Sequence, residues 1–242
     1  MEVLFTIGGG ILFAVWHSFC DALAWRIYHA YYSPERKKVE NKVSFIFYSS
    51  SRCEACRAHV PWYGLIPIAG FFLVQRKCRT CTRPLSLRFV VFETLAFLYG
   101  FFLLHAQVPP LEFVVILVAY LCVWIVMTID YRVLLIPTEA IFTLLVLGFI
   151  YLVVIRHPIW MVLKNGFAPD IDLMLDLAVA FLWYAIFHLL RILSGYKMGA
   201  ADVPLVLALG FLLGHPWAIF LPGLAAFLAI GFYLLRRRSI LI

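Results

Sequence analysis

Long apolar runs constrain this chain more than any other feature of its sequence. Of its 242 residues, 64% are hydrophobic and only 14% are charged, whereas a soluble domain carries about 25% charged residues. Several runs are long enough to cross a hydrocarbon core of about 30 Å as helices. We therefore predict an all-α polytopic membrane protein with about seven transmembrane helices. These spans are residues 3–25, 87–106, 110–129, 138–155, 171–193, 202–214 and 216–235.

The distribution of basic residues orients the spans. With the amino terminus outside, only Arg156 and Lys164 of the 20 Lys and Arg fall on the outer side, so the positive-inside rule favours this orientation. The net charge of +7 then suits acidic lipid headgroups, and no nucleic-acid motif is present. The outer side also carries Asp170, Asp172 and Asp176, which we expect at headgroup level or in solvent.

The polar stretch between the first two spans contains two CxxC pairs, formed by Cys53 with Cys56 and by Cys78 with Cys81. Such pairs are typical of zinc ribbons, in which four thiolates hold one structural ion. Two disulfides or two redox motifs are the alternative, although a reducing cytoplasm disfavours disulfides. We predict a small cytoplasmic zinc-binding loop domain after the first helix.

The chain is thus expected to have three parts, which are the first transmembrane helix (1–26), the zinc-binding loop domain (27–87) and a membrane domain with two aspartates (88–242).

Those two aspartates stand at the ends of apolar runs. Asp130 closes the run 111–129, and Asp202 opens the run 203–214. A carboxylate at membrane depth is costly, so each one marks a candidate functional site. In the orientation above both emerge on the cytoplasmic side. Two carboxylates about 3 Å apart share one proton and act together as acid and base, which is the chemistry of an aspartic protease. Glu93, inside the second span, needs a partner or water.

Together these features resemble the type IV prepilin peptidases, membrane aspartyl proteases of the GxGD class. The resemblance is carried by residues 17–26, by the cysteine loop 53–88 with Glu93 following, by Asp130 with Pro137, and by Gly199-Ala-Ala-Asp202 in place of the second motif, G-x-G-D. Ala201 replaces the second glycine of that motif, which would be harmful if the position needs a positive φ.

The resemblance implies an aspartic endopeptidase that removes the leader of type IV prepilins or pilin-like secretion subunits at the cytoplasmic face of the bacterial inner membrane. Asp130 and Asp202 would be catalytic, and the implied partners are prepilin or pseudopilin precursors and membrane lipids. Many members also methylate the new amino terminus with S-adenosylmethionine, for which this sequence shows no recognisable pocket. The implied metal is structural zinc on the four cysteines.

Two other functions stay open from the sequence. A diverged relative would bind prepilins for assembly without cutting them, a hypothesis motivated by Ala201 and by an end at Ile242, before a further span that many relatives carry. A proton-coupled transporter would use Asp130 and Asp202 as a relay. However, no internal repeat is evident and both aspartates stand near one surface.

Overall fold

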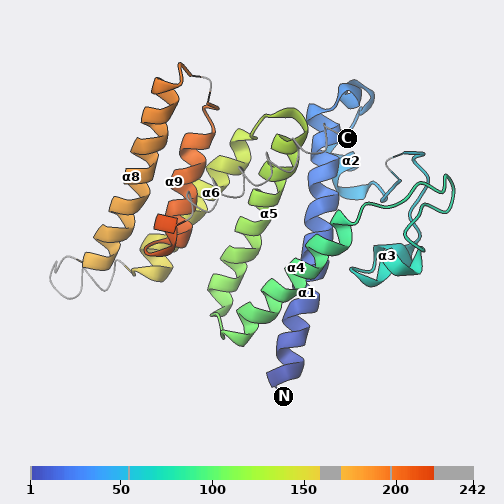
Figure 1. The fold of residues 1–242 in the computed structure, drawn as a ribbon, viewed down its shortest axis with the longest axis horizontal. Coiled ribbons are helices and arrows are strands. Elements are labelled where there is room, and N and C mark those ends of the chain that lie inside the picture. Colours follow the sequence, from blue (N-terminus) through green and yellow to red (C-terminus); the bar gives the residue numbers. More distant parts are fainter. Residues whose placement is uncertain (1, 54, 159–169, 197, 221–242) are drawn as a thin grey trace, which may run out of the picture. The chain divides into compact units, whose positions relative to one another are not determined.

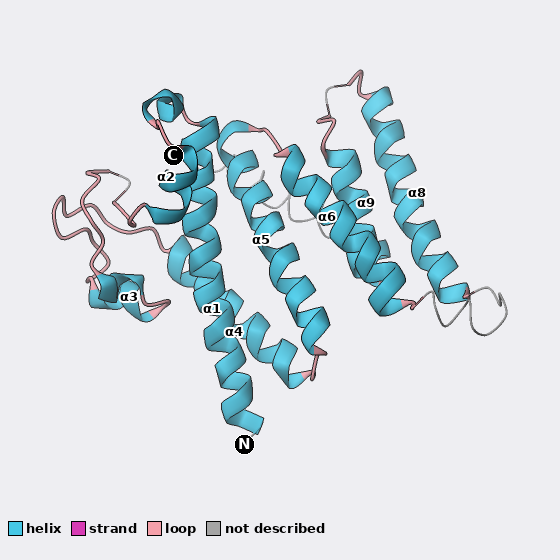
Figure 2. Ribbon diagram, turned by 180° about the vertical axis from the view of Figure 1, so that it is seen from behind, coloured by secondary structure: helices cyan, strands magenta, loops and turns pink. Residues whose placement is uncertain are grey.

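The computed structural model describes residues 2–53, 55–158, 170–196 and 198–220 (Figure 1). These residues form helices, turns and loops and no strand, as Figure 2 shows, so the predicted fold class is confirmed. The chain divides into two compact units, Met1–Pro137 and Thr138–Ile242.

Five helices are long and apolar enough to cross a membrane, namely Val3–Tyr32, Arg88–His105, Pro110–Val133, Thr138–Arg156 and Ile171–Leu193. They match the first five predicted spans. A shorter apolar helix, Asp202–Leu213, corresponds to the short sixth span. Most of the predicted seventh span, 216–235, lies outside the described residues, so five spans of full length are found in the described part and the number seven stays a prediction.

The membrane part of the first unit consists of α1 (Glu2–Ile27), continued by the π-helical turn η1 (Tyr28–Tyr32), α4 (Arg88–His105) and α5 (Pro110–Val133). Glycines let α1 and α4 approach closely. A Cβ on Gly100 would lie 2.5 Å from the Gly9 carbonyl oxygen, and a Cβ on Gly10 would lie 2.7 Å from the Phe97 ring. In membranes, small residues of this kind allow helices to associate through close backbone packing.

Tryptophan N–H groups join α1 to α5. Trp16 Nε1 donates to the Leu117 carbonyl at 3.0 Å, and Trp124 Nε1 donates to Asp21 Oδ1 at 3.2 Å. Phe13, which is fully buried, fills the space between the helices. Asp21 is therefore held in a structural contact inside the unit.

The polar loop of this unit runs from α1 to α4. It contains η2 (Pro34–Lys38), α2 (Lys42–Tyr48), η3 (Trp62–Leu65) and α3 (Ala69–Leu73), with the cysteine pairs before η3 and after α3. Arg26 Nη1 donates to the Ile46 carbonyl at 3.0 Å, which fastens α2 to the end of α1.

The second unit contains α6 (Thr138–Ile150), the π-helical turn η4 (Tyr151–Arg156), α8 (Ile171–Leu193) and α9 (Asp202–Leu213). Helix α9 packs against both α6 and α8, again through glycines. A Cβ on Gly148 of α6 would lie 3.0 Å from the Ala208 carbonyl oxygen, and a Cβ on Gly210 would lie 2.8 Å from Ala180 Cβ. This packing fixes the helix that begins with Asp202.

Candidate active site and metal centre

The four loop cysteines come together in two hairpins of the same geometry. In the first hairpin, Cys53 N–H donates to the Ala58 carbonyl at 2.9 Å and Arg57 N–H donates back to Cys53 at 2.9 Å. The second hairpin has the same two bonds 25 residues later. Cys78 N–H donates to the Arg83 carbonyl at 2.9 Å, and Thr82 N–H donates to the Cys78 carbonyl at 3.0 Å. Arg57 and Thr82 both take a positive φ, of 62° and 56°.

The sulfur positions fit a tetrahedral metal ion. Cys53 Sγ lies 3.8 Å from Cys81 Sγ, Cys56 Sγ lies 3.7 Å from Cys78 Sγ, and all four sulfurs lie within 4.8 Å of one another. Zn–S bonds of about 2.3 Å in a tetrahedron place the sulfurs about 3.8 Å apart, and a disulfide would need about 2.0 Å. The predicted grouping of the four cysteines is confirmed, and the cluster can hold a metal ion.

The thiol pKa values differ within the cluster. The backbone N–H groups of Cys81 and Thr80 lower the pKa of Cys78 to about 6. The Ala58 N–H lowers the pKa of Cys56, but burial and the neighbouring thiols outweigh it and raise that pKa to about 11. Cys78 therefore ionises more readily than Cys56, and a bound divalent cation would favour the thiolate form of every ligand.

Asp130 lies in the last turn of α5, in the first unit. Its carbonyl oxygen accepts the N–H of Leu134 at 2.8 Å, and Leu134 ends the helix in the left-handed conformation with φ 54°. The chain then reaches Pro137, the last residue of this unit. Asp130 thus stands at a helix terminus, as the sequence predicts.

Asp202 is the first residue of α9, in the second unit, and Ala201 is its N-cap. Ala201 has φ −81° and ψ −19°, so this position does not need glycine's freedom at positive φ. Gly199 is the glycine in contact with the aspartate, because a Cβ there would lie 3.0 Å from Asp202 Oδ2 and the carboxylate would have to shift. Asp130 and Asp202 belong to different units, so their convergence stays a prediction.

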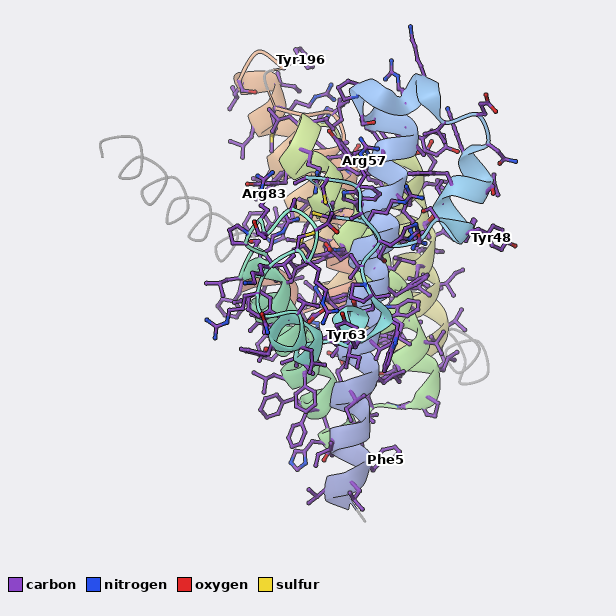
Figure 3. All side chains as sticks on the ribbon, turned by 90° about the vertical axis from the view of Figure 1, so that its right-hand side faces the viewer. Phe5, Tyr48, Arg57, Tyr63, Arg83 and Tyr196 are labelled. Atoms are coloured by element: carbon purple, nitrogen blue, oxygen red, sulfur yellow. The ribbon has the colours of Figure 1, made fainter. Side chains whose placement is uncertain are left out.

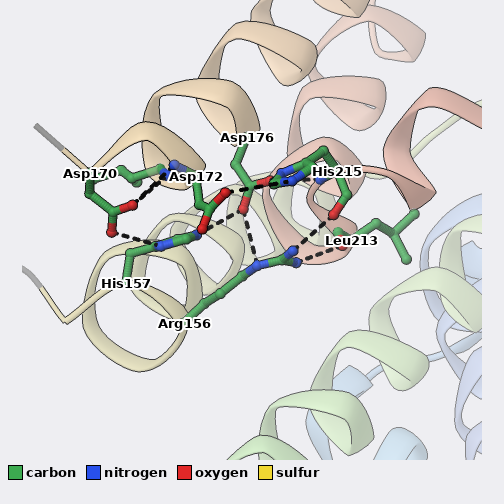
Figure 4. A network of polar contacts seen from close by, with 8 residues as sticks. Arg156, His157, Asp170, Asp172, Asp176, Leu213 and His215 are labelled. Carbon is green, nitrogen blue, oxygen red and sulfur yellow. Dashed lines mark hydrogen bonds and ion pairs between the residues drawn. The ribbon is translucent and has the colours of Figure 1, made fainter.

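A buried polar cluster in the second unit was not predicted from the sequence (Figure 4). Asp176 is fully buried, so the expectation of a solvated side chain is wrong, whereas its level relative to the headgroups stays a prediction. Its carboxylate accepts Arg156 Nε at 3.0 Å and the His215 N–H at 2.6 Å, and it contacts His157 Nε2 at 3.0 Å. The other ring nitrogen of His157 lies 3.0 Å from Asp170 Oδ2.

The sequence did contain a signal for this cluster. Arg156 and His157 follow the predicted fourth span, Asp170 and Asp176 open the fifth, and His215 follows the sixth. The predicted topology places all of these helix ends on one side of the membrane, where opposite charges can pair. The cluster joins η4, α8 and the end of α9.

A cavity of about 520 Å³ lies between η1, α2 and the first cysteine hairpin. Its lining combines a carboxylate, an amide, aromatic rings and a guanidinium, from Glu40, Asn41, Phe45, Tyr48 and Arg57. Its volume is in the range of small-molecule sites.

Comparison with known proteins identifies two family models in tandem. Residues 11–108 match the Bacterial Peptidase A24 N-terminal domain, and residues 117–235 match the Type IV leader peptidase family. The chain is similar to a prepilin leader peptidase/N-methyltransferase of Vibrio cholerae, with 25% identity over 94% of this chain and 86% of the relative. It is also similar to the protein of that name from Aeromonas hydrophila, with 26% identity over 86% of this chain and 71% of the relative. No solved structure matches significantly.

Proposed function

The chain belongs to the type IV leader peptidase family, and we propose that it is an inner-membrane aspartic endopeptidase that removes the leader peptide of type IV prepilins or pilin-like secretion subunits. The observation that carries this proposal is the match of the peptidase model to residues 117–235, a range that contains both Asp130 and Asp202. In the predicted orientation both carboxylates face the cytoplasm, where the leader of a precursor would lie.

The mechanism would use the two aspartates as one unit. One carboxylate is ionised and takes a proton from water, while the other is protonated and donates a hydrogen bond to the scissile carbonyl oxygen. The water oxygen adds to the carbonyl carbon to give a tetrahedral intermediate. The C–N bond then breaks as a proton passes to the departing amine. No acyl-enzyme forms, and the pair titrates with two apparent pKa values of its own.

We assign the three-part organisation accordingly. Residues 1–26 form the first membrane helix, 27–87 the loop domain and 88–242 the protease domain. In the loop domain, Cys53, Cys56, Cys78 and Cys81 would hold structural Zn²⁺, because four thiolates leave no open position for a reacting water. A loop of this size gains its stability from such an ion.

Amino-terminal methylation is the second activity in the name of the relatives. S-adenosylmethionine, when bound, supplies the electrophilic methyl group for a primary amine. The 520 Å³ cavity is our candidate site, since Glu40 suits the ribose hydroxyls, Tyr48 the adenine and Arg57 the methionine carboxylate. Equilibrium binding of S-adenosylmethionine tests it. Glu40→Gln should weaken binding without changing peptide cleavage, and unchanged binding would reject the site.

Cleavage by the purified protein in lipid tests the peptidase proposal. With a prepilin substrate, Asp130→Asn and Asp202→Asn should each lower the rate by about 10²- to 10⁴-fold, which is the usual contribution of a catalytic acid or base. Glu112→Gln, at the opposite end of α5 from Asp130, is the matched control and should leave the rate unchanged. Persistent cleavage by either Asn variant rejects the dyad, whereas precursor binding without cleavage by the native protein indicates a diverged relative.

Metal analysis tests the zinc assignment separately. The purified protein should carry one Zn²⁺ per chain, and the double change Cys53→Ser with Cys78→Ser should remove it. Cys122→Ala, in a buried position of α5, is the control and should retain it. Stoichiometric zinc in a protein without the four loop cysteines contradicts the assignment.

A further inference from the structure

Glu93 lies inside a membrane-spanning helix, yet its partner is the polar loop. Glu93 Oε2 accepts the N–H of Ile68 at 2.6 Å. Ile68 has φ 63° and ψ −59° and is the middle of a γ-turn that Ala69 N–H and the Pro67 carbonyl close at 2.6 Å. This conformation is rare and strained for a β-branched residue. It persists because its surroundings hold it, so the loop is fixed to α4 at this point.

The position of Glu93 sets the depth of that contact. Helix α4 has 18 residues and is therefore about 27 Å long, with no length to spare across a core of about 30 Å. Glu93 is five residues from the start of the helix at Arg88, which is about 7.5 Å along its axis. Ile68, in direct contact with it, must lie at the same level, inside the edge of the hydrocarbon.

The three views of the first unit agree with this depth. Figures 1 and 2 show α3 to one side of α1, at the level of its middle. Figure 3 shows Tyr63 farther from the C-terminal end of α1 than Arg57 and Arg83 of the cysteine hairpins. The segment between the two cysteine pairs therefore runs from the hairpins along the direction of α1, away from its C-terminal end.

The composition of this segment suits lipid rather than water. Residues 65–74 contain no charged side chain. Trp62, Phe72 and Leu73 are 76%, 52% and 53% exposed. An apolar run of about ten residues is too short to span a membrane and is the usual length of a re-entrant or interfacial segment.

The backbone of the segment also meets the requirement of a lipid environment. Gly70 N–H donates to the Ile66 carbonyl at 2.7 Å, and Val74 N–H donates to the Gly70 carbonyl at 3.0 Å. The N–H of Ile68 is taken by Glu93. Non-helical backbone at membrane depth is tolerated only when its polar groups find protein partners, and these three N–H groups have such partners.

Basic side chains follow directly where the segment ends. The Arg76 guanidinium lies 5.4 Å from the centre of the Phe72 ring, and the Arg79 guanidinium lies 5.0 Å from the centre of the Tyr63 ring. Aromatic rings and cations gather at the level of lipid headgroups, where guanidinium groups meet phosphates. This boundary favours acidic lipids.

We propose that residues 62–74 form a re-entrant segment that inserts between acidic lipids in the leaflet on the side of the cysteine hairpins, with Glu93 as its anchor. The proposal needs only that α4 spans the membrane, so it stands independently of the peptidase activity. In this proposal the carboxylate of Glu93 is a positioning residue, because it holds the segment at Ile68.

Photocrosslinking of the full-length protein tests the insertion. The photoreactive residue p-benzoylphenylalanine is placed at Phe72 or, as the control, at Arg83 in the second hairpin, and the protein is reconstituted in nanodiscs of phosphatidylglycerol and phosphatidylethanolamine. We expect lipid adducts several-fold more abundant at position 72 than at position 83, enriched in phosphatidylglycerol. Equal yields at both positions, or crosslinks from position 72 to protein alone, overturn the proposal. Retained metal at the four cysteines confirms that both labelled proteins are folded.

Two further measurements use smaller changes. With brominated lipids, Trp62→Phe should remove a quenched fraction of the tryptophan fluorescence, and an unchanged quenched fraction contradicts the insertion. Glu93→Ala should accelerate amide exchange across residues 62–74, whereas Glu93→Gln, which keeps an acceptor oxygen, should restore most of the protection. Equal exchange in Glu93→Ala and the native protein removes Glu93 as the anchor.

Discussion

Gly199→Ala should impair catalysis by displacing Asp202 alone. Gly199 lies three residues before Asp202, and Asp202 N–H contacts the Gly199 carbonyl at 3.4 Å. An added Cβ would lie 3.0 Å from Asp202 Oδ2 and 3.5 Å from Cγ. Since this is closer than an ordinary carbon–oxygen contact, the carboxylate must move by a few tenths of an ångström.

The size of the effect follows from that displacement. A misplacement of about 1 Å in a catalytic group costs about 10²-fold in rate, so a shift of about half that size should cost about tenfold, or about 1.4 kcal/mol of activation free energy. The loss should appear in kcat for prepilin cleavage, because the carboxylate acts in the chemical step rather than in substrate binding.

A matched glycine provides the control. A Cβ on Gly8 of α1 would meet nothing within 4 Å, so Gly8→Ala should leave kcat unchanged. If Gly199→Ala is folded and cleaves at the native rate, then either Asp202 is not catalytic or its carboxylate is not held against Gly199. Either result refutes the reasoning.

Three further predictions concern the second unit. Ala201→Gly should change kcat by less than about twofold, because φ at Ala201 is already negative; a large gain would show that the position requires glycine. Asp176→Ala should lower the free energy of unfolding by about 3–5 kcal/mol by leaving Arg156 without its buried partner. The Asp172 side chain on the same helix is 73% exposed, so Asp172→Ala should cost far less. Equal losses of the two variants in denaturant titrations contradict this prediction. The N–H of Leu173 and the His157 ring lower the pKa of Asp170 below its ordinary 3.8. The contribution of Asp170 to the stability of the folded protein is therefore complete above pH 3.8 and is lost as the pH falls through the lower pKa of the folded state. Asp170→Asn should remove that acid-dependent loss from melting curves recorded between pH 5 and pH 2.

Sequence spacing was sufficient where the interaction is local or repeated. The two CxxC pairs predicted one cluster, and the hairpins bring their sulfurs to 3.7–3.8 Å. Each hairpin is closed by hydrogen bonds between its own residues. The close approach of Gly9 to Gly100 is of the same local kind, because small residues in a span allow backbones to pack together.

Tertiary partners explain what the sequence did not reveal. Asp176 was expected at headgroup level or in solvent from its position in one span. Its partners come from the ends of two other spans. Nothing in the local pattern marks Ile68 as strained, since its conformation depends on Glu93, 25 residues away. Asp130 and Asp202 lie in two separate units. The cleavage experiment therefore tests whether they act together.

The matching hairpins carry a consequence for how the metal is acquired. Each hairpin supplies two sulfurs, and one hairpin alone would bind an ion weakly. Joining both halves through a short tether makes capture by the second half intramolecular, so its effective concentration reaches the millimolar range. The metal affinity of the site thus depends on the segment between Cys56 and Cys78. Any change that lengthens this segment or makes it more flexible should weaken metal retention although all four ligands are unchanged.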